Sequence, residues 1–228
     1  PKPSSAASDV YKRQLHEDDR KASAFAGMAT RFAAVLRDRI YIGLLIVSVA
    51  QTVSLFAYLN VVPFLFRDAG FGLNVSDFGF WFSFNSLMSV VGVQIGARLG
   101  ARFKAQWVLV AIVATAVASG AGIALLGLAN APFAITEVGF ALLILAFGAT
   151  IPLIQTLALT PHGHEAGTAA SLLGVSNFLV TSLFSPIYTL VPLDNAAPLG
   201  MMMGGAYLVG LLSLIFIVRP KTVPDLAV

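Results

Sequence analysis

Cysteine is absent from this 228-residue sequence, and charged side chains make up only 11% of it. Without cysteine the chain has no disulfide, no thiolate metal site and no cysteine nucleophile. A soluble domain carries about 25% charged residues. Because 57% of the residues are hydrophobic and the mean hydropathy is +0.85, we expect lipid to cover much of the surface. The net charge of +3 lies in short basic clusters between apolar runs, which does not suggest nucleic-acid binding.

The first residues do not read as part of a fold. The string Ser4–Gln14 can be back-translated into the adapter used in transposon-based DNA sequencing, and chance does not explain a match of that length. We therefore expect residues 1–14 not to be native and the reading frame to begin inside a longer gene. Residues 15–39 follow as a cytoplasmic linker, whose second part has the spacing of an amphipathic helix at a membrane surface. A solvated linker is the alternative.

Six apolar stretches fill most of the remaining chain. The first has no charged residue over residues 40–66. About 20 apolar residues of helix cross a bilayer core, where every backbone polar group must be satisfied internally. The sequence therefore predicts an all-α membrane fold. The expected spans are residues 40–66, 78–99, 105–129, 133–160, 167–193 and 199–218, with a cytoplasmic tail at 219–228.

Six spans place both ends of the bundle on one side of the membrane, and the basic residues agree with that count. The basic residues expected on that side are Arg20, Lys21, Arg31, Arg37, Arg39, Arg98, Arg102, Lys104, Arg219 and Lys221. Only Arg67 falls on the other side. Cytoplasmic loops carry an excess of Lys and Arg, so we expect both ends to face the cytoplasm.

Polar side chains inside the spans are the candidates for function. Gln51, Ser54 and Tyr58 follow i, i+3, i+7 spacing and share one helix face. They are predicted to line a substrate cavity, because a polar group in lipid costs several kcal/mol unless it has a partner. Hydrogen bonding between helices is the alternative. The other substrate-cavity candidates are Trp81, Asn85, Met88, Gln155 and Asn177, for which ordinary packing is the alternative.

Glycine and proline residues suggest where helices approach closely or are interrupted. Pro152 lies mid-span and cannot donate a backbone hydrogen bond to the carbonyl of Gly148, so these two residues are predicted to interrupt their helix. The small residues Gly92 and Gly96, four apart on the second span, are expected at a close helix contact.

Two further features are interpreted as structural. Glu137 is the one carboxylate inside an apolar run, and we expect it in the first turn of its helix, where it favours the helix dipole. A proton relay is the alternative. The stretch His162–Glu165 contains two histidines in a short loop without third or fourth ligands nearby, so no metal site is expected. No cofactor is implied.

Three segments resemble a known family of transporters. The segment Phe56–Phe64 resembles the seventh span of Bcr/CflA-type drug efflux proteins of the major facilitator superfamily. Gly148–Pro152 with Thr156–Leu159 resembles their tenth span, and Ala166–Gly174 resembles the start of their eleventh. The chain departs from the pattern we associate with the family in having Leu153 after the proline of the tenth span.

The resemblance implies the fold and activity of half a transporter. The fold would be six helices in a 3+3 inverted repeat, spans seven to twelve of a protein in a bacterial inner membrane. The activity would be proton-coupled export of small drug-like compounds by alternating access, with the protons passing through a missing N-terminal half. A sugar or metabolite carrier is the alternative within the superfamily. An intramembrane enzyme is disfavoured because every histidine lies outside the expected spans, and a channel subunit because no ring of filter residues is visible.

Overall fold

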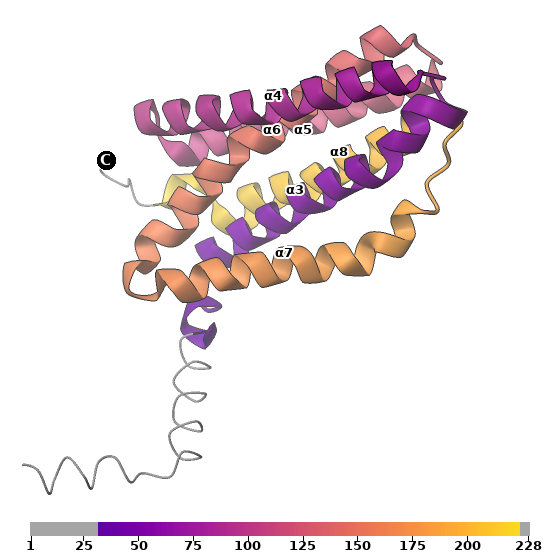
Figure 1. Ribbon diagram of the computed structural model, residues 1–228. Helices are drawn as coiled ribbons and strands as arrows, with labels where there is room; N and C mark the ends of the chain where they lie inside the picture. Colours follow the sequence, from indigo (N-terminus) through magenta and orange to yellow (C-terminus); the bar gives the residue numbers. More distant parts are fainter. Residues whose placement is uncertain (1–31, 224–228) are drawn as a thin grey trace, which may run out of the picture.

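The computed structural model describes residues 32–223, which form helices joined by short loops (Figure 1). Six of these helices are long and apolar enough to cross a membrane, so the expected all-α fold with six spans is confirmed. They are α3 (Arg39–Phe64), α4 (Val75–Arg102), α5 (Ala105–Leu128), α6 (Phe133–Leu159), α7 (Ala166–Tyr188) and α8 (Ala197–Ser213). The stretch interpreted as non-native, residues 1–14, lies outside the described residues, as does most of the linker.

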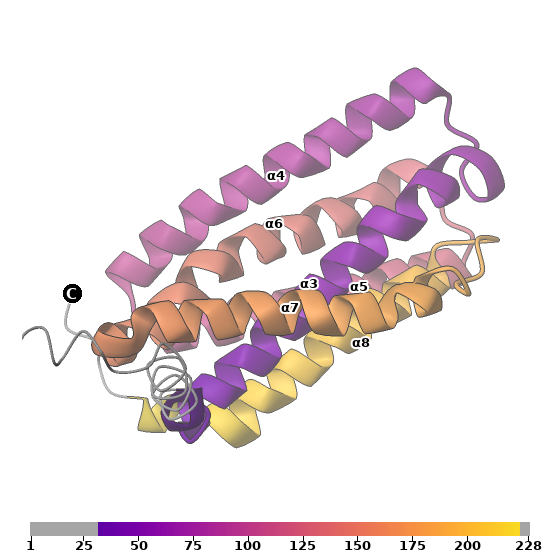
Figure 2. The ribbon, with the colours of Figure 1, turned by 60° about the horizontal axis from the view of Figure 1, so that its bottom comes forward.

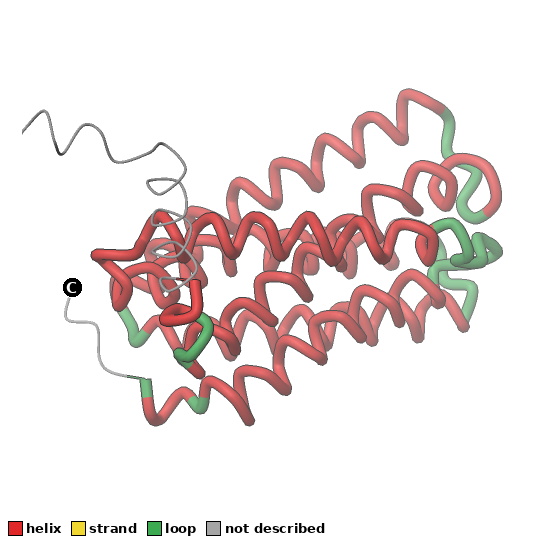
Figure 3. The backbone as a smooth tube through the Cα atoms, turned by 90° about the horizontal axis from the view of Figure 1, so that it is seen from below, coloured by secondary structure: helices red, strands yellow, loops and turns green. Residues whose placement is uncertain are grey.

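Short helical turns extend or connect these spans. A π-helical turn, Leu65–Ala69, continues α3, and another, Leu214–Val218, continues α8. The 3-10 turn Thr160–Glu165 joins α6 to α7, and Pro220–Thr222 forms a last 3-10 turn. Figure 3 shows that the loops gather at the two ends of the bundle.

Several helix boundaries differ from the expected spans, and two of the differences have clear local reasons. Helix α4 begins at Val75, earlier than expected, because the side chain of Asn74 accepts a hydrogen bond from the backbone N–H of Asp77 at 2.8 Å and caps the helix. Helix α7 ends at Tyr188, before the expected residue 193. Val191 precedes a proline, and a residue in that position disfavours helical backbone angles.

The charges divide the bundle into two ends. We call the end where α3 begins and α8 finishes the terminal end. Among residues 32–223, the basic side chains at the terminal end are Arg37, Arg39, Arg98, Arg102, Lys104, Arg219 and Lys221. The opposite end has Arg67 alone. The helices therefore run between one basic end and one end with little positive charge.

Glycine brings the backbones of paired helices into direct contact. A Cβ atom placed on Gly92 of α4 would lie 2.1 Å from the carbonyl oxygen of Leu145 on α6. One placed on Gly148 of α6 would lie 2.0 Å from the carbonyl oxygen of Ser89 on α4. Close approach through small residues is how helices associate tightly in lipid. Helices α5 and α8 meet in the same way, through Gly120, Gly127, Gly200 and Gly204.

Helices α3 and α6 form the centre of the bundle, whereas α4 and α7 lie at its edges. Over their most apolar stretches 56% of the residues of α3 and α6 are buried, against 11% for α4 and α7. In Figure 1 α4 runs along the top of the bundle and α7 along the bottom, and Figure 2 shows α4 along one edge from another side. The two edge helices thus leave much of their surface uncovered in this chain.

Candidate functional site

The polar stripe of α3 points into the bundle. Gln51, Ser54 and Tyr58 are each at most 5% exposed. Gln51 Oε1 accepts a hydrogen bond from the hydroxyl of Thr150 on α6. The stripe therefore lies between α3 and its neighbours within this half, and its contact with substrate remains a prediction.

A buried polar pair joins α4 to α6 beside that stripe. Asn85 Nδ2 donates a hydrogen bond to Glu137 Oε1 at 2.6 Å, and both side chains are at most 2% exposed. Glu137 is the fifth residue of α6, just past the first turn, so the expected place in that turn is wrong. Its partner is a side chain of another helix. The sequence marks both residues as polar within apolar runs, but not that they meet across 52 positions.

Tyr58 completes a three-residue polar cluster with Asn85 and Glu137. Its ring lies 6.0 Å, centroid to centroid, from the rings of Phe82 and Phe140. Its hydroxyl lies close to Asn85 and Glu137 but makes no hydrogen bond of good geometry. Three buried atoms of the cluster lack a partner, namely Tyr58 Oη, Asn85 Oδ1 and Glu137 Oε2. Buried polar atoms are nearly always hydrogen-bonded, so three orphans in one place need an explanation.

The remaining predicted cavity residues do not join this cluster. Trp81 is half-buried, with its ring 5.5 Å from that of Phe133, and Met88 is also half-buried. Gln155 of α6 is exposed. Asn177 of α7 donates a hydrogen bond to the hydroxyl of Ser48 on α3, 3.0 Å away. These residues are spread over different parts of the bundle.

Helix α6 continues through Pro152. The helix extends from Phe133 to Leu159, so the predicted interruption amounts to the one backbone bond that Pro152 cannot donate to the carbonyl of Gly148. Gly148 is needed instead for the contact with α4.

A polar pocket that the sequence analysis missed lies between α3 and α7. It encloses about 340 Å³, and its residues are Phe56, Asn60, Phe178, Thr181, Ser182, Ser185 and Tyr188. Thr181 is 3% exposed and its hydroxyl has no partner. The i, i+4 spacing of Phe56 and Asn60 is a signal that could have revealed this face of α3. A larger cavity of about 580 Å³ between α3, α7 and α8 is lined almost entirely by apolar residues.

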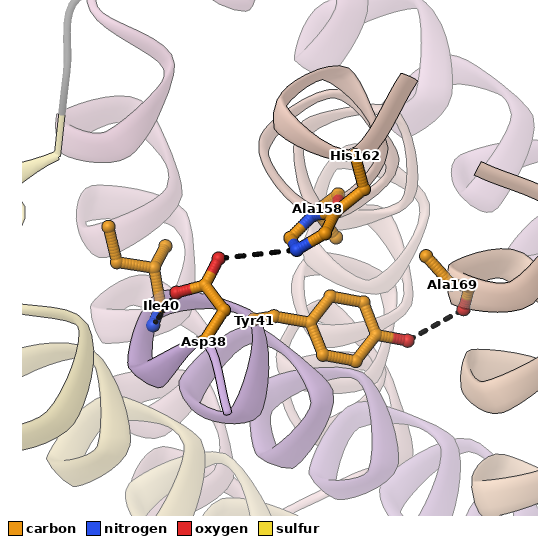
Figure 4. Close-up of polar contacts among 6 residues, drawn as sticks. All are labelled: Asp38, Ile40, Tyr41, Ala158, His162 and Ala169. Carbon is orange, nitrogen blue, oxygen red and sulfur yellow. Dashed lines mark hydrogen bonds and ion pairs between the residues drawn. The ribbon is translucent and has the colours of Figure 1, made fainter. Parts of the chain in front are cut away.

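Polar contacts fasten the terminal end of the bundle (Figure 4). Asp38 caps α3 by accepting a hydrogen bond from the backbone N–H of Ile40 at 2.8 Å, and its other oxygen lies 3.4 Å from His162 Nε2. The hydroxyl of Tyr41 donates to the carbonyl of Ala169 on α7 at 2.6 Å. His162, which was not expected to bind a metal, links the turn after α6 to the start of α3. No group of three potential metal ligands occurs within residues 32–223.

Comparison with known proteins shows which family the chain is similar to. The sequence profile of the Major Facilitator Superfamily matches residues 5–186. Over 202 residues the chain is 25% identical to the "Uncharacterized MFS-type transporter YdgK" of Bacillus subtilis (strain 168). That alignment covers 89% of this chain and 50% of the relative, so the chain spans about half the relative's length. No solved structure matches the chain at a significant level.

Proposed function

The chain belongs to the major facilitator superfamily, and from that premise we propose that it is the C-terminal half of a secondary active transporter. The family consists of transporters rather than enzymes, and the six spans make the chain a multi-pass membrane protein. Transporters of this superfamily pair two six-span halves, each built of two three-span inverted repeats. One such half corresponds to the six helices observed here.

The observation that carries the proposal is the uncovered surface of α4 and α7. Only 11% of the residues in their most apolar stretches are buried, although both helices are long enough to cross the bilayer. Polar side chains line the edge of this surface at α7. Asn60 of the neighbouring α3 lies there next to Ser182 and Ser185 of α7. Lipid gives such groups no hydrogen bonds, whereas a water-filled cavity between two bundles does. Alternating access would rock this bundle against its partner around that cavity.

We propose a small drug-like molecule as the substrate, exported in exchange for protons, as the resemblance to Bcr/CflA-type proteins suggests. The pocket between α3 and α7 combines the aromatic rings of Phe56 and Phe178 with an amide and several hydroxyl groups. Aromatic faces bind flat apolar molecules, and a few polar groups orient them. The same hydroxyl and amide groups also suit a sugar, so a sugar or metabolite carrier is the second candidate.

Substrate would reach the residues predicted from the sequence, and those of the pocket between α3 and α7, in two ways. Gln155 and Asn60 are exposed and available directly. Gln51, Tyr58 and Asn85 are buried between helices, so they would contact substrate only when α3 moves relative to α4 and α6. We propose the bacterial inner membrane as the location, with both ends in the cytoplasm, on the strength of the basic terminal end.

The test uses the full-length protein that contains this chain, expressed in a bacterium stripped of its own drug exporters. We expect raised resistance to some amphipathic drugs and loss of that resistance in Asn60→Ala or Ser185→Ala at equal membrane abundance. Ser76→Ala is the matched control, because Ser76 is exposed at the start of α4, away from the pocket. Sugar uptake without drug resistance would favour the second candidate. No transport of either class by the wild type would contradict the proposal.

A further inference from the structure

We infer that Glu137, Asn85 and Tyr58 form a proton-binding site inside this bundle, with Glu137 Oε2 as the atom that takes up and releases the proton. Proton binding by these residues can be measured without transport. Only its coupling to transport rests on the proposed function. The site differs from the arrangement expected from the sequence, in which protons pass through the other half of the transporter.

The hydrogen bonds of the cluster leave Glu137 Oε2 and two neighbouring atoms without a partner. Asn85 Nδ2 already donates to Glu137 Oε1 at 2.6 Å, which fixes the carboxyl group between α4 and α6. The orphan atoms that remain are Glu137 Oε2, Asn85 Oδ1 and Tyr58 Oη. Asn85 Oδ1 can only accept, and an ionised Oε2 can also only accept. The Tyr58 hydroxyl has one proton to donate and can satisfy only one of these two acceptors. A proton on Oε2 would give the cluster the second donor that it needs.

The charged groups around Glu137 favour a carboxyl group that is neutralised by a proton over one that is neutralised by a basic side chain. Of the helices packed against α6, α5 has no titratable side chain. On α4 the charged groups are Asp77, Arg98 and Arg102, at the two ends of that helix, whereas Asn85 lies in between. Tyr58 of α3 is the titratable group next to the carboxyl.

Most charged groups at the ends of α3 and α7 lie at the terminal end, away from Glu137. Arg39 begins α3 at the terminal end, and His162 and Glu165 precede α7 there. Arg67, in the π-helical turn after α3, lies at the same end as Glu137, but it is exposed and no ion pair joins the two side chains. Glu137 is one turn into α6 from the opposite end. A buried carboxylate without a cation is strongly unfavourable. Taking up a proton at Oε2 removes that charge by forming one O–H bond, and releasing the proton to water breaks it, with no redox change.

A row of polar groups continues from this cluster along α3. Ser54 lies one helical turn from Tyr58 on the same face, is fully buried, and has a hydroxyl without a partner. One further turn along, Gln51 accepts a hydrogen bond from Thr150 of α6. Polar side chains inside a membrane bundle commonly mark proton relays. These groups would provide a polar path for a proton between Glu137 and the middle of the bundle.

The direct test is infrared spectroscopy of the purified full-length protein, titrated with pH in sodium-free buffer. We expect a carbonyl band of a protonated carboxyl group that titrates with pH and is missing from Glu137→Gln. The matched control is Glu165→Gln in the turn before α7, which should keep the band. Tyr58→Phe, which keeps the ring and removes one orphan hydroxyl, should shift the pH midpoint of the band.

The outcomes separate a proton site from its alternatives. A wild-type protein without a titrating carboxyl band in sodium-free buffer would overturn the inference, whereas a band lost on adding sodium at constant pH would show that sodium competes with a proton bound there, and would support it. A band equally strong in Glu137→Gln would overturn it as well, as would a midpoint unchanged in Tyr58→Phe. Gln keeps the acceptor for Asn85, and a sample of Glu137→Gln that elutes as a monodisperse peak would rule out misfolding as the cause of a lost band.

A transport measurement then tests the coupling. In proteoliposomes Glu137→Gln should retain substrate exchange at equilibrium but lose at least tenfold in accumulation driven by a pH gradient. Accumulation equal to wild type would overturn the coupling role. A wild type that moves no substrate contradicts the proposed function instead, and leaves the infrared result to decide proton binding.

Discussion

At Gly92 a single hydrogen atom occupies the space where any other residue would place a carbon. The Cβ position lies 2.1 Å from the carbonyl oxygen of Leu145, which is backbone and cannot rotate away. We expect Gly92→Ala to push α4 from α6 and lower the free energy of unfolding by about 1–3 kcal/mol, the usual cost of overpacking. Thermal denaturation of the full-length protein in detergent, followed by size-exclusion chromatography, measures the effect.

Gly122 of α5 provides the matched control for that prediction. A Cβ atom placed there meets nothing within 4 Å. Because alanine favours a helix over glycine by about 1 kcal/mol, Gly122→Ala should be neutral or stabilising. Equal melting temperatures for the two variants would mean that α4 and α6 are not in backbone contact.

Individual polar residues could be recognised from the sequence, but their partners could not. Asn85 and Glu137 stand out because each interrupts an apolar run. Their 2.6 Å hydrogen bond depends on the approach of α4 to α6, which joins positions far apart in the chain. The expected role of Glu137 at the helix dipole failed for the same reason, since only the fold reveals a neighbour on another helix. Whether the predicted cavity residues contact substrate stays a prediction.

At the scale of elements, α7 is attached mainly to α3. The hydroxyl of Tyr41 donates to Ala169 O at one end of α7, and Asn177 donates to Ser48 near the middle. A net hydrogen bond is worth about 1 kcal/mol. We expect Asn177→Ala to loosen the middle of α7 and speed its backbone hydrogen exchange, measured by mass spectrometry on the full-length protein.

Ser182→Ala is the control for this experiment. The hydroxyl of Ser182 bonds only to the carbonyl of Phe178 in the same helix, 2.7 Å away. Its loss should leave the exchange of α7 near the wild-type rate. If Asn177→Ala exchanged no faster than Ser182→Ala, the contact between α3 and α7 would not hold α7 in place.

The number and approximate position of the elements followed from apolar length, because a bilayer demands long uncharged helices. Helix ends depended on finer chemistry. The cap at Asn74 extended α4, and the proline after Val191 shortened α7. Pro152 did not predict the end of a helix. A helix supported by neighbours on several sides can lose one backbone hydrogen bond and continue, as α6 does.

At the scale of the whole molecule, the basic terminal end predicts the orientation in the membrane. Because this sequence contains no cysteine, a single introduced cysteine is the one thiol of this chain, and the full-length protein without it gives the background of labelling. We expect a membrane-impermeant maleimide to label Ser76→Cys, at the start of α4, in intact cells. Phe103→Cys, an exposed position after α4 at the terminal end, should be labelled only after the cells are opened. The reverse pattern would place both ends of the bundle outside.

The superfamily could be recognised from short motifs, and six spans agree with a chain that covers half of its relative. What the sequence did not reveal is which faces stay uncovered. The polar stripe at Gln51 and Tyr58 was expected at the cavity wall, yet these residues are buried between helices. Asn60, two residues beyond Tyr58, is the exposed one. Hydropathy cannot separate a polar group facing a cavity from one facing another helix.

The glycine contacts between α4 and α6 limit how this bundle can move. Carbonyl oxygens of each helix fit against glycine positions of the other, so a shear of one helix along the other would move Leu145 and Ser89 off the positions that leave room for them. Shear needs interfaces that tolerate small displacements. We therefore expect α4 and α6 to tilt together as one block in any movement of the bundle.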